Sequence, residues 1–186
     1  MPLFRKLAGP RELAVSMVGV KLGDRLLQVG CGDGRLLAAL AAKVGLTGRA
    51  CAVDVSREGV ERAERAARKE GVLLDVAHAP FDRLPHDDAA FDVVVLQDVL
   101  ATLGAADRTR GLGETRRVLR PGGRCVVIER TGRHGVTALF ARPEPIDEQY
   151  RTGGAAAALA AAQFVAARTL ADREGLRFVE AIRPRA

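Results

Sequence analysis

The sequence predicts an α/β fold in three layers, with helices covering both faces of a mostly parallel sheet. Short apolar runs alternate along the chain with segments whose apolar residues recur at helical spacing. The first apolar run ends in a Gly30-x-Gly32-x-Gly34 turn, and a helical pattern begins directly after it. The second run ends in an acid, Asp54. A strand, glycine turn, helix, strand and acid in this order form a site for the adenosine part of a cofactor.

Strands are predicted where apolar runs lie between turn residues. We expect them over residues 25–29, 50–54, 72–76, 91–96, 124–129 and 176–182. Strands that alternate with helices in this way favour parallel pairing, because each connection crosses back over the sheet. The carboxyl ends of the first two strands then meet at the glycine turn and Asp54.

Helices are predicted in the remaining segments. We expect them over residues 11–20, 34–44, 57–70, 107–119 and, as one long helix, 155–174. In the second of these, Leu36, Leu40 and Val44 share one face. In the third, glutamates and arginines alternate at spacings of three and four, which is typical of a solvated face with charge pairs. The alanine-rich stretch over 155–171 is interrupted by polar residues, so it predicts a packed helix rather than a membrane span.

The composition is that of a globular protein. At 186 residues the chain is long enough for a full core, and we predict a single domain over residues 1–186. A hydrophobic content of 48% with 28% charged residues excludes a disordered chain. The net charge is +6, and only four of the 29 basic residues are lysines. Because the arginines are scattered among acids, the pattern disfavours a nucleic-acid partner.

Cysteine and histidine patterns point away from disulfides and metals. None of the three cysteines forms a CxxC pair, and their odd count disfavours a disulfide framework. His78, His86 and His134 have no ligand spacing with one another or with cysteine, so no metal is expected. The N-terminal residues lack an uninterrupted apolar segment, and we therefore expect a cytoplasmic protein without membrane insertion.

The spacing of the glycine turn selects the kind of cofactor. A dinucleotide site needs G-x-G-x-x-G, whereas the third glycine here is Gly34 and Arg35 follows it. This spacing favours a ligand without a pyrophosphate. An NAD-dependent dehydrogenase is accordingly the weakest alternative.

Four motifs in order resemble those of the class I S-adenosylmethionine (SAM) dependent methyltransferases. They are the glycine turn, the acid that ends the second strand, a Leu-Pro…Phe-Asp-Val-Val segment over residues 84–96, and a segment over residues 117–128 that contains an Arg-Pro-Gly-Gly turn. The resemblance covers about residues 20–130 and is nearest to the small-molecule branch typified by ubiquinone and menaquinone biosynthesis enzymes. It implies a three-layer Rossmann-like fold, with a cofactor half over about residues 20–100 and acceptor-side segments over residues 1–20 and 130–155.

The resemblance also implies which residues bind the cofactor. They are Gln28, Gly30, Gly32, Asp54, Val55, Pro80, Phe81 and Gln97. Asp54 would accept hydrogen bonds from the ribose hydroxyls, and the glycines would let the ligand approach the backbone. Two positions depart from the family, in which an acid usually holds the methionine ammonium at the position of Gln28 and another often lies at Pro80. Gln28 can still accept a hydrogen bond through its amide oxygen, and a weakened or inactive SAM site remains an alternative.

We therefore expect transfer of a methyl group from SAM to a small acceptor by in-line displacement. The absence of tryptophan and the single tyrosine favour an aliphatic acceptor pocket, which would suit an apolar acceptor. Asp98 and His134 are the candidate catalytic residues, with Glu129 as a third candidate base, needed only if the acceptor must lose a proton. Two alternatives stay open: an RNA methyltransferase, suggested by the excess of arginine, and a non-catalytic methyltransferase-like binding protein.

One strand of the family fold has no counterpart among the predicted elements. The family's sheet ends in a hairpin whose last strand is antiparallel, yet only Pro184, Arg185 and Ala186 follow the apolar segment 176–183. We therefore expect the last antiparallel strand to be missing. The open sheet edge that results would allow two subunits to pair as a homodimer.

Overall fold

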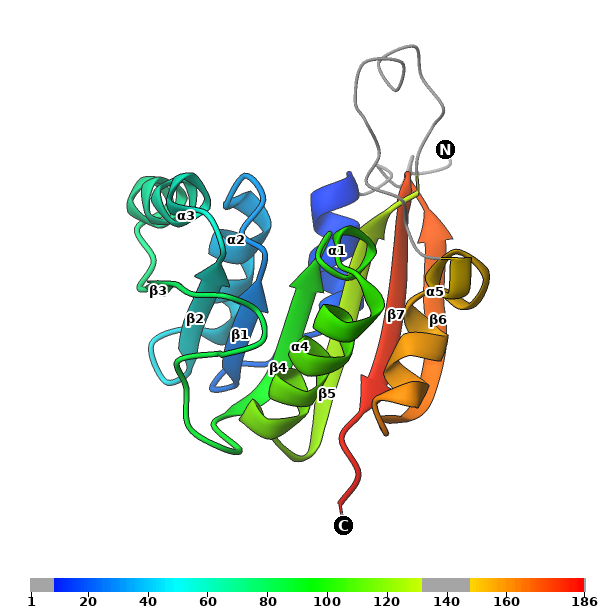
Figure 1. Cartoon of the computed structure of the whole chain (residues 1–186). Coiled ribbons are helices and arrows are strands. Elements are labelled where there is room, and N and C mark those ends of the chain that lie inside the picture. Colours follow the sequence, from blue (N-terminus) through cyan, green and yellow to red (C-terminus); the bar gives the residue numbers. More distant parts are fainter. Residues whose placement is uncertain (1–8, 132–147, 186) are drawn as a thin grey trace.

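The described part of the chain forms a seven-stranded mixed sheet with helices on both faces (Figure 1). The structure is a computed structural model that describes residues 9–131 and 148–185. The strands are β1 (Arg25–Val29), β2 (Arg49–Asp54), β3 (Asp75–His78), β4 (Phe91–Gln97), β5 (Leu119–Arg130), β6 (Val165–Arg173) and β7 (Leu176–Ile182). The helices are α1 (Pro10–Val18), α2 (Arg35–Val44), α3 (Arg57–Glu70), α4 (Ala105–Val118) and α5 (Glu148–Ala161), and a short 3-10 helix, η1, spans Leu100–Thr102.

The strand order in the sheet is β3-β2-β1-β4-β5-β7-β6. Neighbouring strands from β3 to β5 are parallel, whereas β7 is antiparallel to both β5 and β6. The order reverses between β1 and β4, so the carboxyl ends of these strands flank the crevice where open α/β sheets bind ligands. The predicted fold class, a mostly parallel sheet in an α/β fold, is confirmed.

Helices cover both faces of the sheet (Figure 1), and an apolar core lies beneath them on each face. On one face, Leu112 of α4 and Leu159 of α5 pack over Val127 of β5. On the other face, α1 and α2 cover the sheet, and Leu40 packs in the same cluster as Val95 of β4. Because the central strands are covered on both sides, they are apolar on both sides, which explains their continuous apolar runs.

The segments around the site begin and end close to their predicted positions. The observed bounds of α3 are those predicted, 57–70, and Ser56 caps this helix by accepting a hydrogen bond from Gly59 N at 3.1 Å. The third strand lies later than the predicted range of 72–76, at Asp75–His78. All four of its residues pair with the end of β2, from Cys51 to Asp54.

The C-terminal part of the chain differs from the prediction. The long helix expected over 155–174 is wrong, because α5 ends at Ala161 and β6 begins at Val165. β6 and β7 form the antiparallel hairpin that closes the sheet, so the strand that was expected to be missing is present. Glu174 and Gly175 make the turn between them, with φ of 57° and 72°, the backbone region that two-residue hairpin turns require.

The reason for this difference is that β6 is an edge strand without a fully buried residue. The alternation of apolar and polar residues that identifies a strand is therefore absent, and its alanines continue the composition of α5. The pairing of β6 with β7 shifts register twice, and Ala166 has φ of 54°. Bulges at an edge discourage pairing with a further strand. The edge strand β6 is thus irregular and does not offer the open edge on which the predicted homodimer was based. The homodimer remains a prediction.

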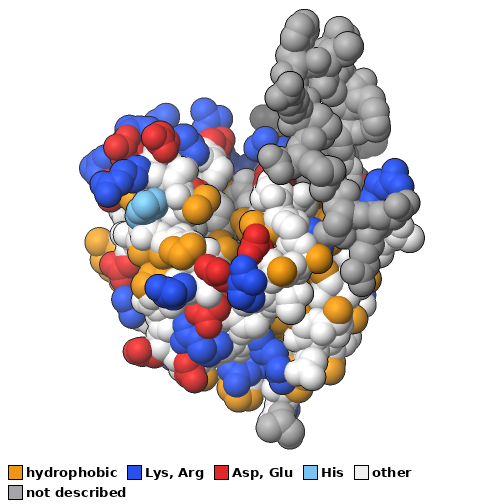
Figure 2. All heavy atoms as spheres, viewed as in Figure 1, with side chains coloured by type: hydrophobic (Ala, Val, Ile, Leu, Met, Phe, Trp, Pro, Cys, Tyr) orange, Lys and Arg blue, Asp and Glu red, His pale blue; other side chains and the backbone are white. Residues whose placement is uncertain are grey.

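Charged side chains of both signs are interspersed over the face that carries α4 (Figure 2). On α3, Arg65 lies 3.4 Å from Glu61 and Arg68 lies 3.6 Å from Glu64, which are the charge pairs that the sequence pattern predicts. Among the described residues, no helix has both the length and the apolar character needed to cross a membrane.

Candidate functional site

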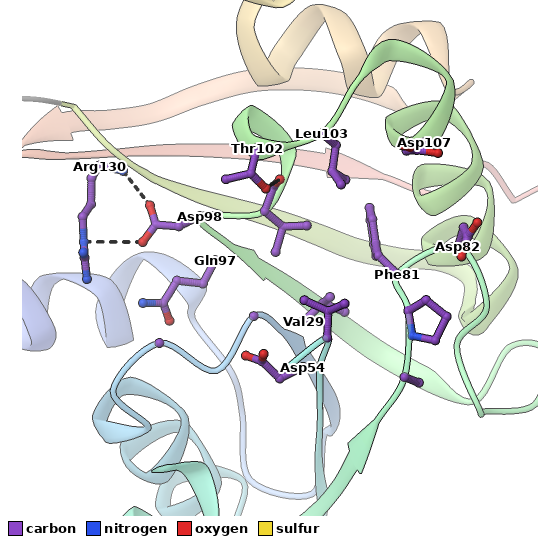
Figure 3. Close-up of a pocket in the computed structure, with 16 residues that line it drawn as sticks. Val29, Asp54, Phe81, Asp82, Gln97, Asp98, Thr102, Leu103, Asp107 and Arg130 are labelled. Atoms are coloured by element: carbon purple, nitrogen blue, oxygen red, sulfur yellow. Dashed lines mark hydrogen bonds and ion pairs between the residues drawn. The ribbon is translucent and has the colours of Figure 1, made fainter. Parts of the chain in front are cut away.

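A cavity of about 510 Å³ opens at the carboxyl ends of β1, β2 and β4 (Figure 3). Volumes in this range are typical of small-molecule sites. Seven of the residues predicted to bind a cofactor line it: Gly30, Gly32, Asp54, Val55, Pro80, Phe81 and Gln97. The remaining predicted residue, Gln28, lies on β1 behind the cavity wall and is 0% exposed.

The glycine turn exposes backbone to the cavity at two positions. Gly30 and Gly32 have φ of 81° and 55°, a region that favours glycine. A methyl group on Gly30 would collide with the carbonyl oxygen of Gln97, and one on Gly32 would lie 2.8 Å from Gln97 Nε2. A side chain at either position would therefore displace Gln97 or fill the space through which a ligand reaches the backbone.

Asp54 ends β2 and lines the cavity with a carboxylate that is already partly engaged. Its Oδ2 accepts a hydrogen bond from Cys31 N at 2.8 Å, and its Oδ1 accepts from Ser56 N at 2.9 Å and Ser56 Oγ at 2.8 Å. Burial alone would raise the pKa of Asp54, but these hydrogen bonds, with Arg62, outweigh it and lower the pKa. A carboxylate has about four acceptor positions. About one of them, on Oδ2, is therefore left for a ligand.

Gln28 and Gln97 form a hydrogen-bonded pair beneath the glycine turn. Gln28 Nε2 donates to Gly30 O at 2.9 Å and to Gln97 Oε1 at 2.9 Å. Gln28 Oε1 is buried and has no hydrogen-bond partner among the described residues. The sequence suggested that this oxygen accepts from a ligand, whereas the structure buries it and gives the position at the cavity wall to Gln97.

The opposite wall of the cavity is the loop between β3 and β4, and α4 supports it at two points. At the first point, the ring of Phe81 lies directly over Gly111 of α4, so closely that a methyl group on Gly111 would collide with it. Phe81 itself is largely buried and lines the cavity. The absence of a side chain at Gly111 therefore sets how deep the aromatic ring lies.

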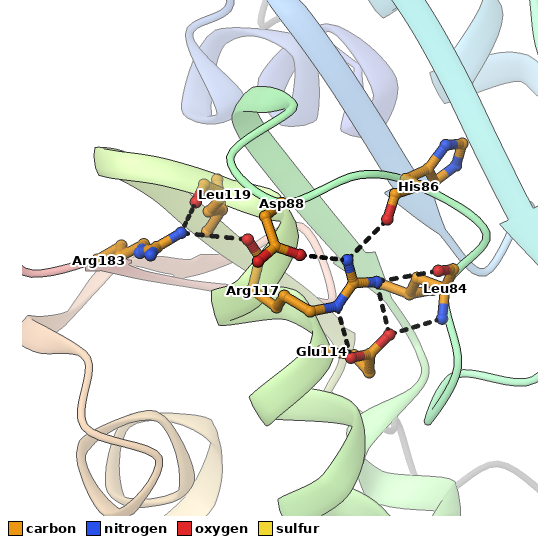
Figure 4. Close-up of polar contacts among 7 residues, drawn as sticks. All are labelled: Leu84, His86, Asp88, Glu114, Arg117, Leu119 and Arg183. Atoms are coloured by element: carbon orange, nitrogen blue, oxygen red, sulfur yellow. Dashed lines mark hydrogen bonds and ion pairs between the residues drawn. The ribbon is translucent and has the colours of Figure 1, made fainter.

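The second point of support is Arg117, near the end of α4, which uses all five of its N–H donors (Figure 4). Its Nε and Nη2 donate to the two carboxylate oxygens of Glu114 at 2.7 and 2.8 Å. Nη2 also donates to Leu84 O at 3.0 Å, while Nη1 donates to His86 O at 2.7 Å and Asp88 Oδ1 at 2.8 Å. Glu114 in turn accepts from Leu84 N at 2.9 Å. Two motifs that the sequence offered only as signs of a family are thus in direct contact.

Asp98 lines the cavity directly after β4, but its carboxylate is engaged. The residue has φ of 53°, its Oδ1 accepts from Arg130 N at 2.9 Å, and its Oδ2 lies 3.4 Å from Arg130 Nε. His134 lies outside the described residues, as does the greater part of the predicted acceptor-side segment over 130–155. Of the two candidate catalytic residues, the structure therefore places Asp98 alone at the cavity.

Glu129, the third candidate base, lies at the end of β5 on the side of the sheet that α5 covers. The hydroxyl of Tyr150 donates a hydrogen bond to it, and the guanidinium of Arg108 lies 4.0 Å from the centre of the tyrosine ring. Burial raises the pKa of Glu129, and the hydrogen bond from Tyr150 offsets only part of this effect. Sequence reasoning missed Tyr150 and Arg108 because the three residues belong to three separate elements. The one available signal was that Tyr150 is the only tyrosine in the chain.

A second cavity, of about 770 Å³, shares Gln97, Asp98 and Arg130 with the first. Its other walls are the N-terminal ends of α1 and α2, the end of β5 and the β6–β7 turn. Aliphatic residues line part of it, and charged residues from α1, from the start of α2 and from the turn line the rest. Whichever group this cavity holds would therefore meet aliphatic and charged side chains together. Within residues 9–131 and 148–185, no three His, Cys, Asp or Glu side chains are grouped closely enough to hold a metal ion.

Residues 27–127 match the family model described as the methyltransferase domain. This range contains the glycine turn, Asp54, the loop with Phe81 and the motif that carries Arg117. It covers more than half of the chain, and the protein therefore belongs to the methyltransferase domain family. The predicted resemblance to this class is confirmed.

Curated relatives of this chain include quinone methyltransferases. It is 34% identical over 123 residues to 2-phytyl-1,4-beta-naphthoquinone methyltransferase of Arabidopsis thaliana, a match that covers 64% of this chain and 46% of the relative. It is 32% identical over 119 residues to the ubiquinone/menaquinone biosynthesis C-methyltransferase of Chromobacterium violaceum, covering 64% of this chain and 48% of that protein. The chain thus spans about half the length of these relatives.

One solved structure resembles this chain over almost the whole length of both proteins. The SAM-dependent methyltransferase from Aquifex aeolicus superimposes with a TM-score of 0.77 and 24% sequence identity, covering 94% of this chain and 90% of that one. The Rossmann-like methyltransferase fold expected from the sequence is therefore confirmed.

Proposed function

We propose that the first cavity binds SAM and that the chain transfers its methyl group to a small acceptor by in-line displacement. The observation that carries this proposal is the Asp54 carboxylate, held ionised beside a turn whose backbone Gly30 and Gly32 leave open. Family membership supports it independently. We further propose that residues 1–186 act as a single domain in the cytoplasm.

The residues around the cavity fit the parts of SAM. Asp54 would accept from a ribose hydroxyl through the remaining position on Oδ2. Phe81, Pro80 and Val55 would enclose the adenine, since an aromatic ring and aliphatic groups suit a flat apolar base. Gln97 would contact the amino-acid end beside Gly32.

SAM supplies an electrophilic methyl carbon, so the protein has to align the acceptor and exclude water more than it has to activate it. The second cavity shares a wall with the first and has the volume to hold the acceptor. The names of the curated relatives suggest a quinone-type ring. If the acceptor must lose a proton, Asp98 is the nearer candidate base, and Arg130 would have to release it first.

The engaged carboxylate of Asp98 also favours one alternative. With Arg130 bound to it, the cavity presents no free base at this position, as a non-catalytic binding protein would. Such a protein would bind SAM and S-adenosylhomocysteine (SAH) without turnover. Methyl transfer to a quinol by protein shown to bind SAM would exclude the non-catalytic alternative.

Titration calorimetry with SAM and SAH tests the proposal. Loss of one charge-assisted hydrogen bond of about 1.5–3 kcal/mol predicts that Asp54→Ala weakens binding roughly 10- to 100-fold. Asp172→Ala is the matched control, because Asp172 pairs with Arg177 on the exposed β6 edge. The control variant should bind like the wild type. A folded wild-type protein that binds neither ligand would refute the proposal.

A further inference from the structure

The end of the first cavity beside the glycine turn is built from two side-chain amides in series. Gln28 is the next-to-last residue of β1, and Gln97 ends the neighbouring strand β4. Gln28 contacts both Gly30 O and Gln97 Oε1 through its amide nitrogen. Gln97 then lines the cavity, with its Nε2 beside Gly32.

The orientation of both amides follows from the first contact. The two ends of a glutamine amide have nearly the same shape, so hydrogen-bond partners decide which end lies where. A backbone carbonyl such as Gly30 O can only accept. If Gln28 were reversed, two oxygens would face each other at 2.9 Å, and the contact with Gln97 would lose its donor unless that amide reversed too. Gln28 therefore presents its nitrogen.

The orientation of Gln28 determines that of Gln97. Because Gln28 Nε2 donates, the atom of Gln97 that meets it must be Oε1. Gln97 Nε2 consequently points away from Gln28, toward the turn, where a methyl group on Gly32 would lie 2.8 Å from it. No described residue accepts a hydrogen bond from this nitrogen. The cavity end is thus lined by a neutral N–H donor.

Carboxylates nearby do not reverse this polarity. Asp98 is paired with Arg130, and Asp33 lies 3.6 Å from Arg35. One acceptor at the turn, Gly30 O, already receives the hydrogen bond from Gln28. At the side-chain amide of Gln97, a ligand group that accepts hydrogen bonds is therefore better matched than one that donates them.

We infer that this end of the cavity selects the carboxylate of an amino-acid-bearing adenosine ligand rather than its ammonium group, and that Gln28 is a positioning residue that sets this preference through Gln97. The inference rests on the proposed function, since SAM and SAH carry both groups on one carbon. The neutral amide at position 28, which departs from the family pattern, is then what gives the site its preference.

Binding calorimetry with three ligands tests the inference: SAH, its deaminated analogue, which keeps the carboxylate, and its decarboxylated analogue, which keeps the ammonium. For the wild type we expect the deaminated analogue to bind within about threefold of SAH and the decarboxylated analogue to bind at least roughly tenfold more weakly, as loss of one hydrogen bond to a charged group predicts. Equal or tighter binding of the decarboxylated analogue would overturn the inference.

Two variants test the role of Gln28. Gln28→Met keeps the side-chain length but cannot hold Gln97, so the preference between the analogues should fall toward unity. In Gln28→Glu, the carboxyl group carries at most one proton, which Gly30 O accepts, so Gln97 must turn its nitrogen toward the carboxyl group and present oxygen to the cavity, which should reverse the preference. Gln163→Glu, at a surface glutamine that contacts Arg116, is the matched control and should leave the preference unchanged.

The outcomes separate the two proposals. If the folded wild type binds SAH but the preference does not change in either Gln28 variant, the inference fails and the proposed function stands. If the wild type binds none of the three ligands, both fail. Side-chain amide signals in nuclear magnetic resonance spectra give a second readout, because those of Gln97 should shift in Gln28→Met before any ligand is added.

Discussion

Replacing Arg117 with alanine should loosen the loop that forms one wall of the first cavity. The guanidinium joins α4 to this loop through the backbone oxygens of Leu84 and His86 and the carboxylate of Asp88, and Glu114 completes the network. Alanine removes all five hydrogen bonds at once. The backbone oxygens then lose a charged donor, and water must replace it in a partly buried position.

The size of the effect follows from how exposed each contact is. The Asp88 side chain is 78% exposed, so its contact with Arg117 contributes little. The contacts to Leu84 O, His86 O and the less exposed Glu114 carry most of the stabilisation. Taking hydrogen bonds to charged groups as partly screened, we expect a loss of about 2–3 kcal/mol. For a chain of this length, that corresponds to a fall in melting temperature of roughly 5–10 °C.

Thermal unfolding followed by circular dichroism measures this change, and hydrogen exchange at residues 79–90 locates it. Arg68→Ala is the matched control. Arg68 makes an exposed ion pair with Glu64, and both residues lie on α3, away from α4. Its free energy of unfolding should change by less than about 0.5 kcal/mol. If Arg117→Ala melts within the range of the control and the loop exchanges no faster, the network does not hold the loop as reasoned.

Three further predictions concern single side chains. Gly111→Ala should weaken SAH binding in calorimetry, because the added methyl group displaces Phe81 from the cavity wall. In the free energy of unfolding, overpacking costs about 1–3 kcal/mol and offsets the gain in helix propensity of about 1 kcal/mol. Unchanged affinity for SAH would contradict the prediction. Asp92 accepts a hydrogen bond from Arg25 N at 2.7 Å. Burial acts to raise the pKa of Asp92, but its hydrogen bonds outweigh burial and lower the pKa. The stability that Asp92 contributes to the fold is therefore present above the unfolded pKa of about 3.9 and is lost as pH falls through the lower pKa of the folded state. The stability difference between wild type and Asp92→Asn should accordingly shrink in acid, as urea titrations at several pH values would reveal. Burial raises the pKa of Cys31 to about 12, and all three cysteines are buried, so an aromatic disulfide reagent should label no thiol quickly in the native protein and three after denaturation.

The sequence predicted the cofactor half of the fold well because its signals are local. The glycine turn, the acid at Asp54 and the strands around them lie within one continuous stretch, and burial on both faces makes those strands apolar throughout. Family resemblance then identified Val55, Phe81 and Gln97, all of which line the cavity.

Features that depend on distant contacts were not predictable in the same way. The orientation of Gln28 depends on Gly30 O and on Gln97 in another strand, so the sequence could suggest the residue but not the direction of its amide. The contact of Tyr150 with Glu129 joins α5 to β5 and has no pattern within either segment. β6 was missed because an edge strand without buried residues lacks the alternation by which strands are recognised.

The hairpin turn at Glu174 and Gly175 has a consequence for how this protein can change over generations. The turn helps to enclose the second cavity but does not contact the first, which is lined by residues between Val29 and Asp107 together with Arg130. Substitutions in the turn can therefore alter the shape and charge of one compartment while the other keeps its walls. If the second cavity holds the acceptor, as proposed, a lineage could acquire a different acceptor through a few changes near the C-terminus while the walls of the first cavity stay the same.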